Sequence, residues 1–70
     1  MKEYLVVYEM GENGEWGASS PDLPGCVAVG ETQAEVERLI REAIPAHLAL
    51  MREAGEPVPE PHHRAGTIAA

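Results

Sequence analysis

The stretch SPDLPGCVAVGETQAE, residues 20–35, decides the fold. A proline-rich turn ends one extended segment, a short apolar strand follows over residues 26–29, and a helix begins after Thr32. The Thr32 hydroxyl can accept a hydrogen bond from a first-turn amide, and Glu35 can reach back to the Thr32 amide, which is the capping-box pattern. Gly30 supplies a flexible corner before the helix. This pattern predicts a fold and indicates no catalytic device.

One long amphipathic helix is predicted over residues 33–54. Its apolar face collects Val36, Leu39, Ile40, Ala43, Ile44, His47, Leu48, Leu50, Met51 and Ala54. Pro45 falls on the polar side, where water can replace the lost backbone hydrogen bond, so a bend is expected and not a break. Gly55 and then Pro57 end the helix.

Strands are predicted on the N-terminal side of this helix. Residues 3–10 and 15–20 are strand-favouring, and Asn13-Gly14 between them suits a hairpin turn with positive φ angles. With the strand at 26–29 and a last short strand near Ile68, the fold class is α+β. We expect a two-layer β-β-β-α-β arrangement, in which one long, Pro-bent helix covers one face of an antiparallel sheet.

The first strand is apolar on both faces, which a chain of this size can hardly cover. Small residues on one face of the second strand, Gly17 and Ser19, would let a partner approach closely. The sequence therefore predicts an oligomer or partner interface that includes Tyr4, Leu5, Val6, Val7, Tyr8 and Trp16. The alternatives are a twisted sheet with a half-exposed second face and, for Trp16, plain core packing.

Length and charge restrict the function. Seventy residues form one small domain, which usually needs a disulfide, a metal or a partner subunit for comfortable stability. Cys26 is the single cysteine, so no internal disulfide can form, and a free thiol fits the cytoplasm. The net charge of −7 argues against nucleic acid and suits a basic protein partner. No membrane span or signal peptide is evident in the sequence.

The residues with reactive side chains are expected to be structural. Asp22 is expected to bond to turn amides, and Cys26 to be buried and inert. His47 lies in the apolar stripe and is expected to be packed and hydrogen-bonded. His62 and His63 are adjacent and would point apart on an extended chain, so no metal site or cofactor is predicted.

Several of these motifs resemble those of HicB-type antitoxins. The segments SPDLPGC at 20–26, GET at 30–32 and AE at 34–35 resemble the signature of that family, and EAI at 42–44 and GEPVP at 55–59 are similar to its helix middle and exit. The resemblance covers residues 4–61. It implies the N-terminal, partial ribonuclease-H-like domain of HicB, which self-associates and in complete members covers a small, basic, RNA-cleaving toxin, HicA.

The resemblance leads to one main hypothesis. Residues 1–70 are expected to form a single HicB-like domain without a DNA-binding domain and without the metal-binding carboxylates of ribonuclease H. The function expected is non-catalytic: a homo-oligomer, dimer or tetramer, that neutralises a HicA-like toxin. The alternatives are a small enzyme that uses Cys26 or Asp22 with His47, and an orphan regulatory oligomer that binds a small ligand between subunits.

Overall fold

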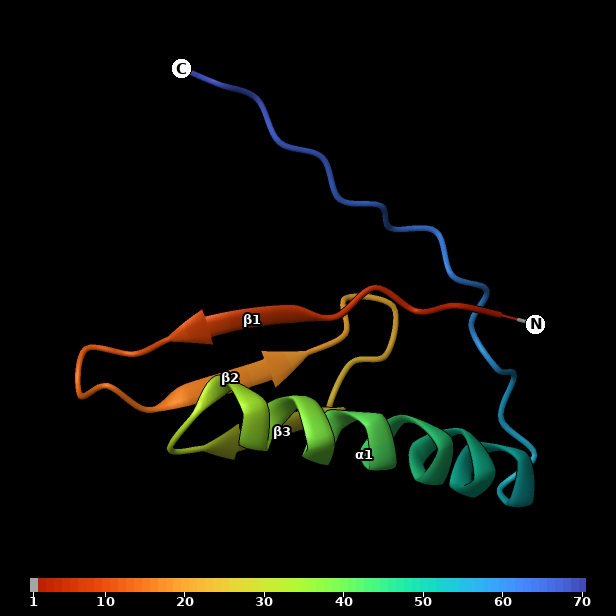
Figure 1. The fold of residues 1–70 in the computed structure, drawn as a ribbon. Coiled ribbons are helices and arrows are strands. Elements are labelled where there is room, and N and C mark those ends of the chain that lie inside the picture. Colours follow the sequence, from red (N-terminus) through yellow and green to blue (C-terminus); the bar gives the residue numbers. More distant parts are fainter. Residues whose placement is uncertain (1) are drawn as a thin grey trace.

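Three short strands precede one long helix in the computed structural model, which describes residues 2–70 (Figure 1). The strands are β1 (Val7–Met10), β2 (Trp16–Ser19) and β3 (Val27–Gly30), and the helix is α1 (Gln33–Glu53). The sheet is antiparallel with the order β1-β2-β3, so β1 and β3 are its edge strands. The α+β class and the single long helix are confirmed.

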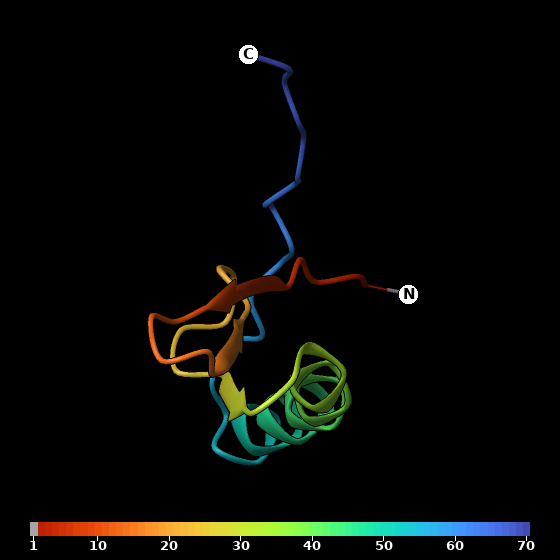
Figure 2. The ribbon, with the colours of Figure 1, turned by 60° about the vertical axis from the view of Figure 1, so that its left-hand side comes forward.

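The register of the sheet separates two faces. Tyr8, Ala18 and Ala28 lie in one row across the three strands, and all three contact the core that α1 covers. The neighbouring row, Val7, Ser19 and Val27, points the other way because side chains alternate along a strand. Figure 2, which views α1 almost along its axis, shows the helix on one side of the sheet only.

The turn between β1 and β2 is held by the backbone conformation of Gly14 and by two hydrogen bonds. Gly14 has a φ of 84°, a backbone conformation that favours glycine, while Asn13 does not share it. The Asn13 side chain instead accepts a hydrogen bond from the Glu15 amide at 3.0 Å, and the Gly11 amide donates to the Glu15 carbonyl at 2.7 Å. Both contacts hold the chain reversal in place.

The loop of residues 20–26 is part of the core. Leu23 donates its amide to the Ser20 carbonyl, and Cys26 donates to the Leu23 carbonyl, each at 3.1 Å, so two consecutive turns drive Leu23 inward. Leu23, Val36 and Ile40 are the largest fully buried side chains. Burial of each contributes about 1.5–3 kcal/mol relative to exposure, which fixes α1 against the sheet and the loop.

The Thr32 cap and the Gly55 ending of α1 form as the sequence predicts, but among residues 2–70 the Glu35 carboxylate accepts no hydrogen bond from the Thr32 amide. Thr32 caps the helix by accepting from the Glu35 amide at 3.1 Å, and the Glu35 side chain lies close over Gly30. At the other end Gly55 has a φ of 71°, and the amides of Gly55 and Glu56 donate to the carbonyls of Arg52 and Met51. This is a Schellman motif. Pro45 lies inside the continuous helix, with its side chain exposed.

Three expectations about the elements need correction. The first strand begins at Val7 and not at residue 3. Leu50, assigned to the apolar stripe of the helix, is 65% exposed, because α1 extends beyond the short strands there. Within residues 2–70 no strand follows α1, and Ile68 is 95% exposed, so the last strand expected near Ile68 does not form in the single chain.

The segment after α1 returns to the N-terminal residues and then leaves the body. The Tyr4 hydroxyl donates to the Pro59 carbonyl at 2.6 Å, and Lys2 forms an ion pair with Glu60 at 2.9 Å. Beyond residue 64 the chain extends away from the sheet and helix (Figure 1). Within residues 2–70 the structure contains no helix with the length and apolar character that crossing a bilayer requires.

Candidate functional site

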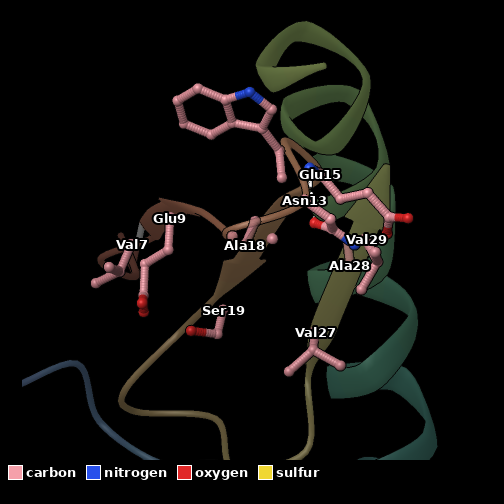
Figure 3. Close-up of a pocket in the computed structure, with 12 residues that line it drawn as sticks. Val7, Glu9, Asn13, Glu15, Ala18, Ser19, Val27, Ala28 and Val29 are labelled. Atoms are coloured by element: carbon pink, nitrogen blue, oxygen red, sulfur yellow. Dashed lines mark hydrogen bonds between the residues drawn. The ribbon is translucent and has the colours of Figure 1, made fainter. Parts of the chain in front are cut away.

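The sheet face opposite α1 is an apolar surface that the described chain leaves uncovered. Val27 and Val29 on β3 are 63% and 62% exposed, and Val7 on β1 is 37% exposed. Figure 3 shows these side chains around a hollow whose floor is formed by the small residues of β2. Gly17 and Ser19 lie there, as predicted, and leave room for a partner between the two edge strands.

Carboxylates lie around this hollow. Glu9 lies two residues after Val7 on β1, and Glu15 lies directly before β2. Both side chains line the hollow and are exposed. An apolar surface beside negative charge suits a partner that offers apolar side chains and basic groups. A second copy of this chain, with its own net charge of −7, would bring like charges together on the same face.

The six residues of the predicted interface do not lie on one surface of the structure. Tyr4, Val6, Tyr8 and Trp16 are half-buried and pack against the core cluster on the helix side. Val7 lies on the uncovered face, and Leu5 is half-buried beside Pro61 and His63 of the C-terminal segment.

Val27 and Val29 were not among the predicted interface residues. The signal was present in the sequence, since the alternation in Val27-Ala28-Val29 places both valines opposite the buried Ala28 row.

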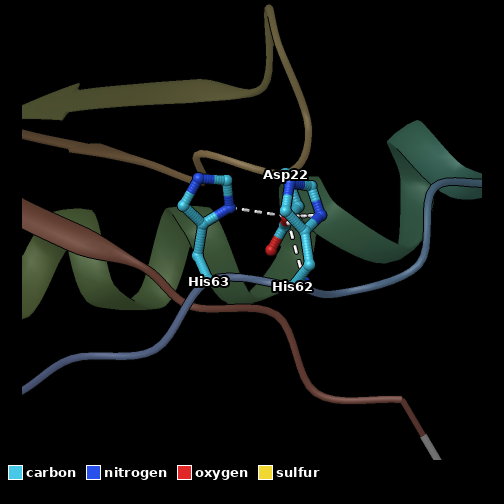
Figure 4. Close-up of side chains that lie close together, drawn as sticks. All are labelled: Asp22, His62 and His63. Carbon is cyan, nitrogen blue, oxygen red and sulfur yellow. Dashed lines mark hydrogen bonds and ion pairs between the residues drawn. The ribbon is translucent and has the colours of Figure 1, made fainter.

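A second site joins the loop of residues 20–26 to the C-terminal segment. His63 Nδ1 lies 2.7 Å from Asp22 Oδ1, and the His62 amide donates to the same oxygen at 3.2 Å (Figure 4). His62 Nδ1 is also 2.7 Å from Asp22 Oδ1. The prediction that Asp22 bonds to turn amides is wrong, and so is the prediction that the two histidines point apart. Their rings lie side by side, with centroids 4.4 Å apart.

The Asp22 carboxylate is buried and unevenly satisfied. Its side chain has no exposed surface, and Oδ2 has no hydrogen-bond partner among the described residues. Burial raises the pKa of Asp22, but the hydrogen bonds from His63 and the His62 amide and the nearby imidazoles lower it, so the pKa lies below its ordinary value. The carboxyl is therefore ionised near neutral pH.

Cys26 and His47 do not form a nucleophile–base arrangement. Cys26, directly before β3, is 4% exposed, and its burial is as predicted. Burial raises the pKa of its thiol, which opposes formation of the reactive thiolate. His47 is half-buried and lines a different hollow, with Leu23, Pro24 and Pro59.

Comparison with known proteins gives a consistent result. Residues 4–70 match the family model described as HicB_like antitoxin of bacterial toxin-antitoxin system. The UPF0150 protein Ta0767 of Thermoplasma acidophilum is 31% identical over 68 residues, which cover 97% of this chain and 99% of that protein.

A solved structure agrees with the sequence comparisons. The crystal structure of the N-terminal domain of Burkholderia pseudomallei antitoxin HicB superimposes with a TM-score of 0.66 and 29% sequence identity. The superposition covers 89% of this chain and 69% of that one.

Proposed function

Because the chain belongs to the HicB-like antitoxin family, we propose that it is a non-catalytic antitoxin domain that binds and neutralises a small, basic, HicA-like RNA-cleaving toxin in the cytoplasm. The observation that carries the proposal is the uncovered sheet face. It presents Val7, Val27 and Val29 beside Glu9 and Glu15 on a chain of net charge −7.

The charge on this face favours the toxin as its occupant. RNA-binding proteins carry exposed Lys and Arg side chains, and a partner of this kind would place them near Glu9 and Glu15 while covering the valines. Covering the toxin's basic surface would also keep RNA away from it. Neutralisation then requires binding alone.

We propose that the chain associates with itself through a different surface, the β1 edge of the sheet. β1 is an edge strand, and the extended residues before it, Tyr4, Leu5 and Val6, continue along the same edge. Pairing of two such edges would extend the sheet without bringing the two acidic faces together. The core is small, with five buried hydrophobic residues among residues 2–70, and this is a further reason to expect a dimer or tetramer.

An RNA-cleavage assay tests the proposed function. A purified HicA-like toxin would be incubated with RNA, and the chain added at increasing ratios. Cleavage should stop once every toxin molecule has a chain bound to it. If RNA is cleaved at the same rate in a large excess of the chain, the neutralising role is wrong and the chain is an orphan oligomer.

A further inference from the structure

The cluster of Asp22, His62 and His63 has a use that the antitoxin role does not require. Three groups that are common metal ligands, one carboxylate and two imidazoles, have ligand atoms within 4.8 Å of one another. They come from two segments of the chain that are 40 and 41 residues apart in sequence. We propose that Asp22, His62 and His63 bind a divalent transition-metal ion of the zinc type, which fastens the C-terminal segment to the loop of residues 20–26.

Three nitrogen atoms surround one oxygen of the Asp22 carboxylate, and this arrangement favours a cation between the carboxylate and the imidazoles. Asp22 Oδ1 has the Nδ1 atoms of both His62 and His63 at 2.7 Å and the His62 amide at 3.2 Å. Two neutral imidazoles can share that oxygen only through their Nδ1 protons. His62 Nδ1 also lies 3.1 Å from the Glu60 carbonyl oxygen, which competes for the same proton. A metal ion would replace these protons with bonds to the nitrogen lone pairs.

The second carboxylate oxygen is an independent sign of a missing partner. Asp22 is 97% buried, yet its Oδ2 has no hydrogen-bond partner among the described residues, and an ionised buried oxygen of that kind is costly. A metal ion held between the carboxylate and the two imidazoles would neutralise the charge that Oδ2 shares. The His62 amide would still donate to the carboxylate and orient it, as is usual around metal ligands.

The required movement is small. Ligand atoms about 2.0–2.2 Å from a tetrahedral zinc ion are roughly 3.4 Å apart, so each imidazole nitrogen must move away from Asp22 Oδ1 by less than about 1 Å. The ligand atoms of the cluster lie within 4.8 Å of one another, so the widest pair must close by at most about 1.4 Å. The side chains of His62 and His63 are 71% and 42% exposed and can make this movement. Three protein ligands would leave the fourth position to water. Imidazole and carboxylate together suit zinc, nickel and copper better than magnesium or calcium.

Zinc titration of the untagged, full-length chain tests the proposal. Calorimetry should show one zinc ion bound per chain. Each neutral imidazole can offer its Nδ1 lone pair to the ion once its ring proton lies on Nε2. The His62→Gln and His63→Gln variants should each bind zinc at least about tenfold more weakly. Asp22→Asn should do the same, but it changes a buried group, so the two exposed histidines decide the outcome. His47→Gln, which removes the histidine outside the cluster, is the matched control and should bind zinc like the unchanged chain.

Limited trypsin digestion gives a second readout. Arg64 follows His63 directly and is exposed, so zinc that holds His63 against Asp22 should slow cleavage after Arg64 several-fold. The same zinc should not protect the His63→Gln variant. The proposal is overturned if the chain takes up no zinc, if both histidine variants bind it as tightly as the unchanged chain, or if cleavage after Arg64 is equally fast with and without it.

Discussion

The double substitution Val27→Ser and Val29→Ser should weaken toxin binding strongly and leave the fold in place. The two side chains are 63% and 62% exposed in the single chain. Burying a whole valine contributes about 1.5 kcal/mol at the low end of the usual range, so covering the exposed part of each is worth about 1 kcal/mol. Loss of both should therefore cost about 2 kcal/mol, or about 30-fold in Kd.

Calorimetric titration of the HicA-like toxin into each variant measures this effect. The double variant keeps the net charge of −7, so a weaker Kd reports lost apolar contact and not lost attraction. Leu50→Ser is the matched control, because Leu50 is 65% exposed but lies on α1, away from the uncovered face. Its Kd should be unchanged. Equal toxin affinity in the double variant and the unchanged chain, with both folded by circular dichroism, would refute the assignment of the toxin to this face.

Three further predictions concern the fold. The Ile40 side chain is 2% exposed, so Ile40→Ala leaves a cavity in the core and should lower the free energy of unfolding in urea by about 2–5 kcal/mol. That loss is enough to unfold much of so small a domain. A loss below about 1 kcal/mol would contradict the assigned core. Thr32→Ala removes the acceptor for the Glu35 amide and should cost about 1 kcal/mol in the same assay, whereas Thr32→Ser should cost little. Burial raises the pKa of Cys26 above its unfolded value of about 8.5, so the stability that the neutral thiol contributes is complete below that pH and is lost as the pH rises through the folded pKa. The urea midpoint should therefore fall more steeply above about pH 8.5 in the unchanged chain than in the Cys26→Ala variant. Parallel curves of urea midpoint against pH would refute this.

The sequence predicted best the features that depend on neighbouring residues. The Thr32 cap, the Gly55 ending and the Gly14 turn are local choices of backbone conformation and hydrogen bonding, and all three are confirmed. The same holds for Gly17 and Ser19 on one face of β2, because alternation along a strand is a local rule. The start of β1 was less predictable, since pairing with the short β2 limits its length.

The Asp22 cluster could not be predicted in the same way. Its members are 40 and 41 residues apart, and no rule of spacing connects a loop to a proline-rich segment that follows a helix. Their meeting depends on the path of residues 56–61. Two contacts between opposite ends of the chain hold that path: the hydrogen bond from Tyr4 to Pro59 and the ion pair of Lys2 with Glu60. The rule that adjacent side chains point apart applies to regular strands, which residues 62–63 do not form.

Light scattering on a chromatography column tests whether the chain associates with itself and binds a HicA-like toxin. The chain would be run alone, and then mixed with a purified HicA-like toxin. We predict a dimer or tetramer alone, and a heavier species of fixed stoichiometry in the mixture. The Val27→Ser and Val29→Ser double variant should form that species only at about 30-fold higher concentration. A mixture that elutes as two separate species, each with the mass it has alone, would contradict the antitoxin function.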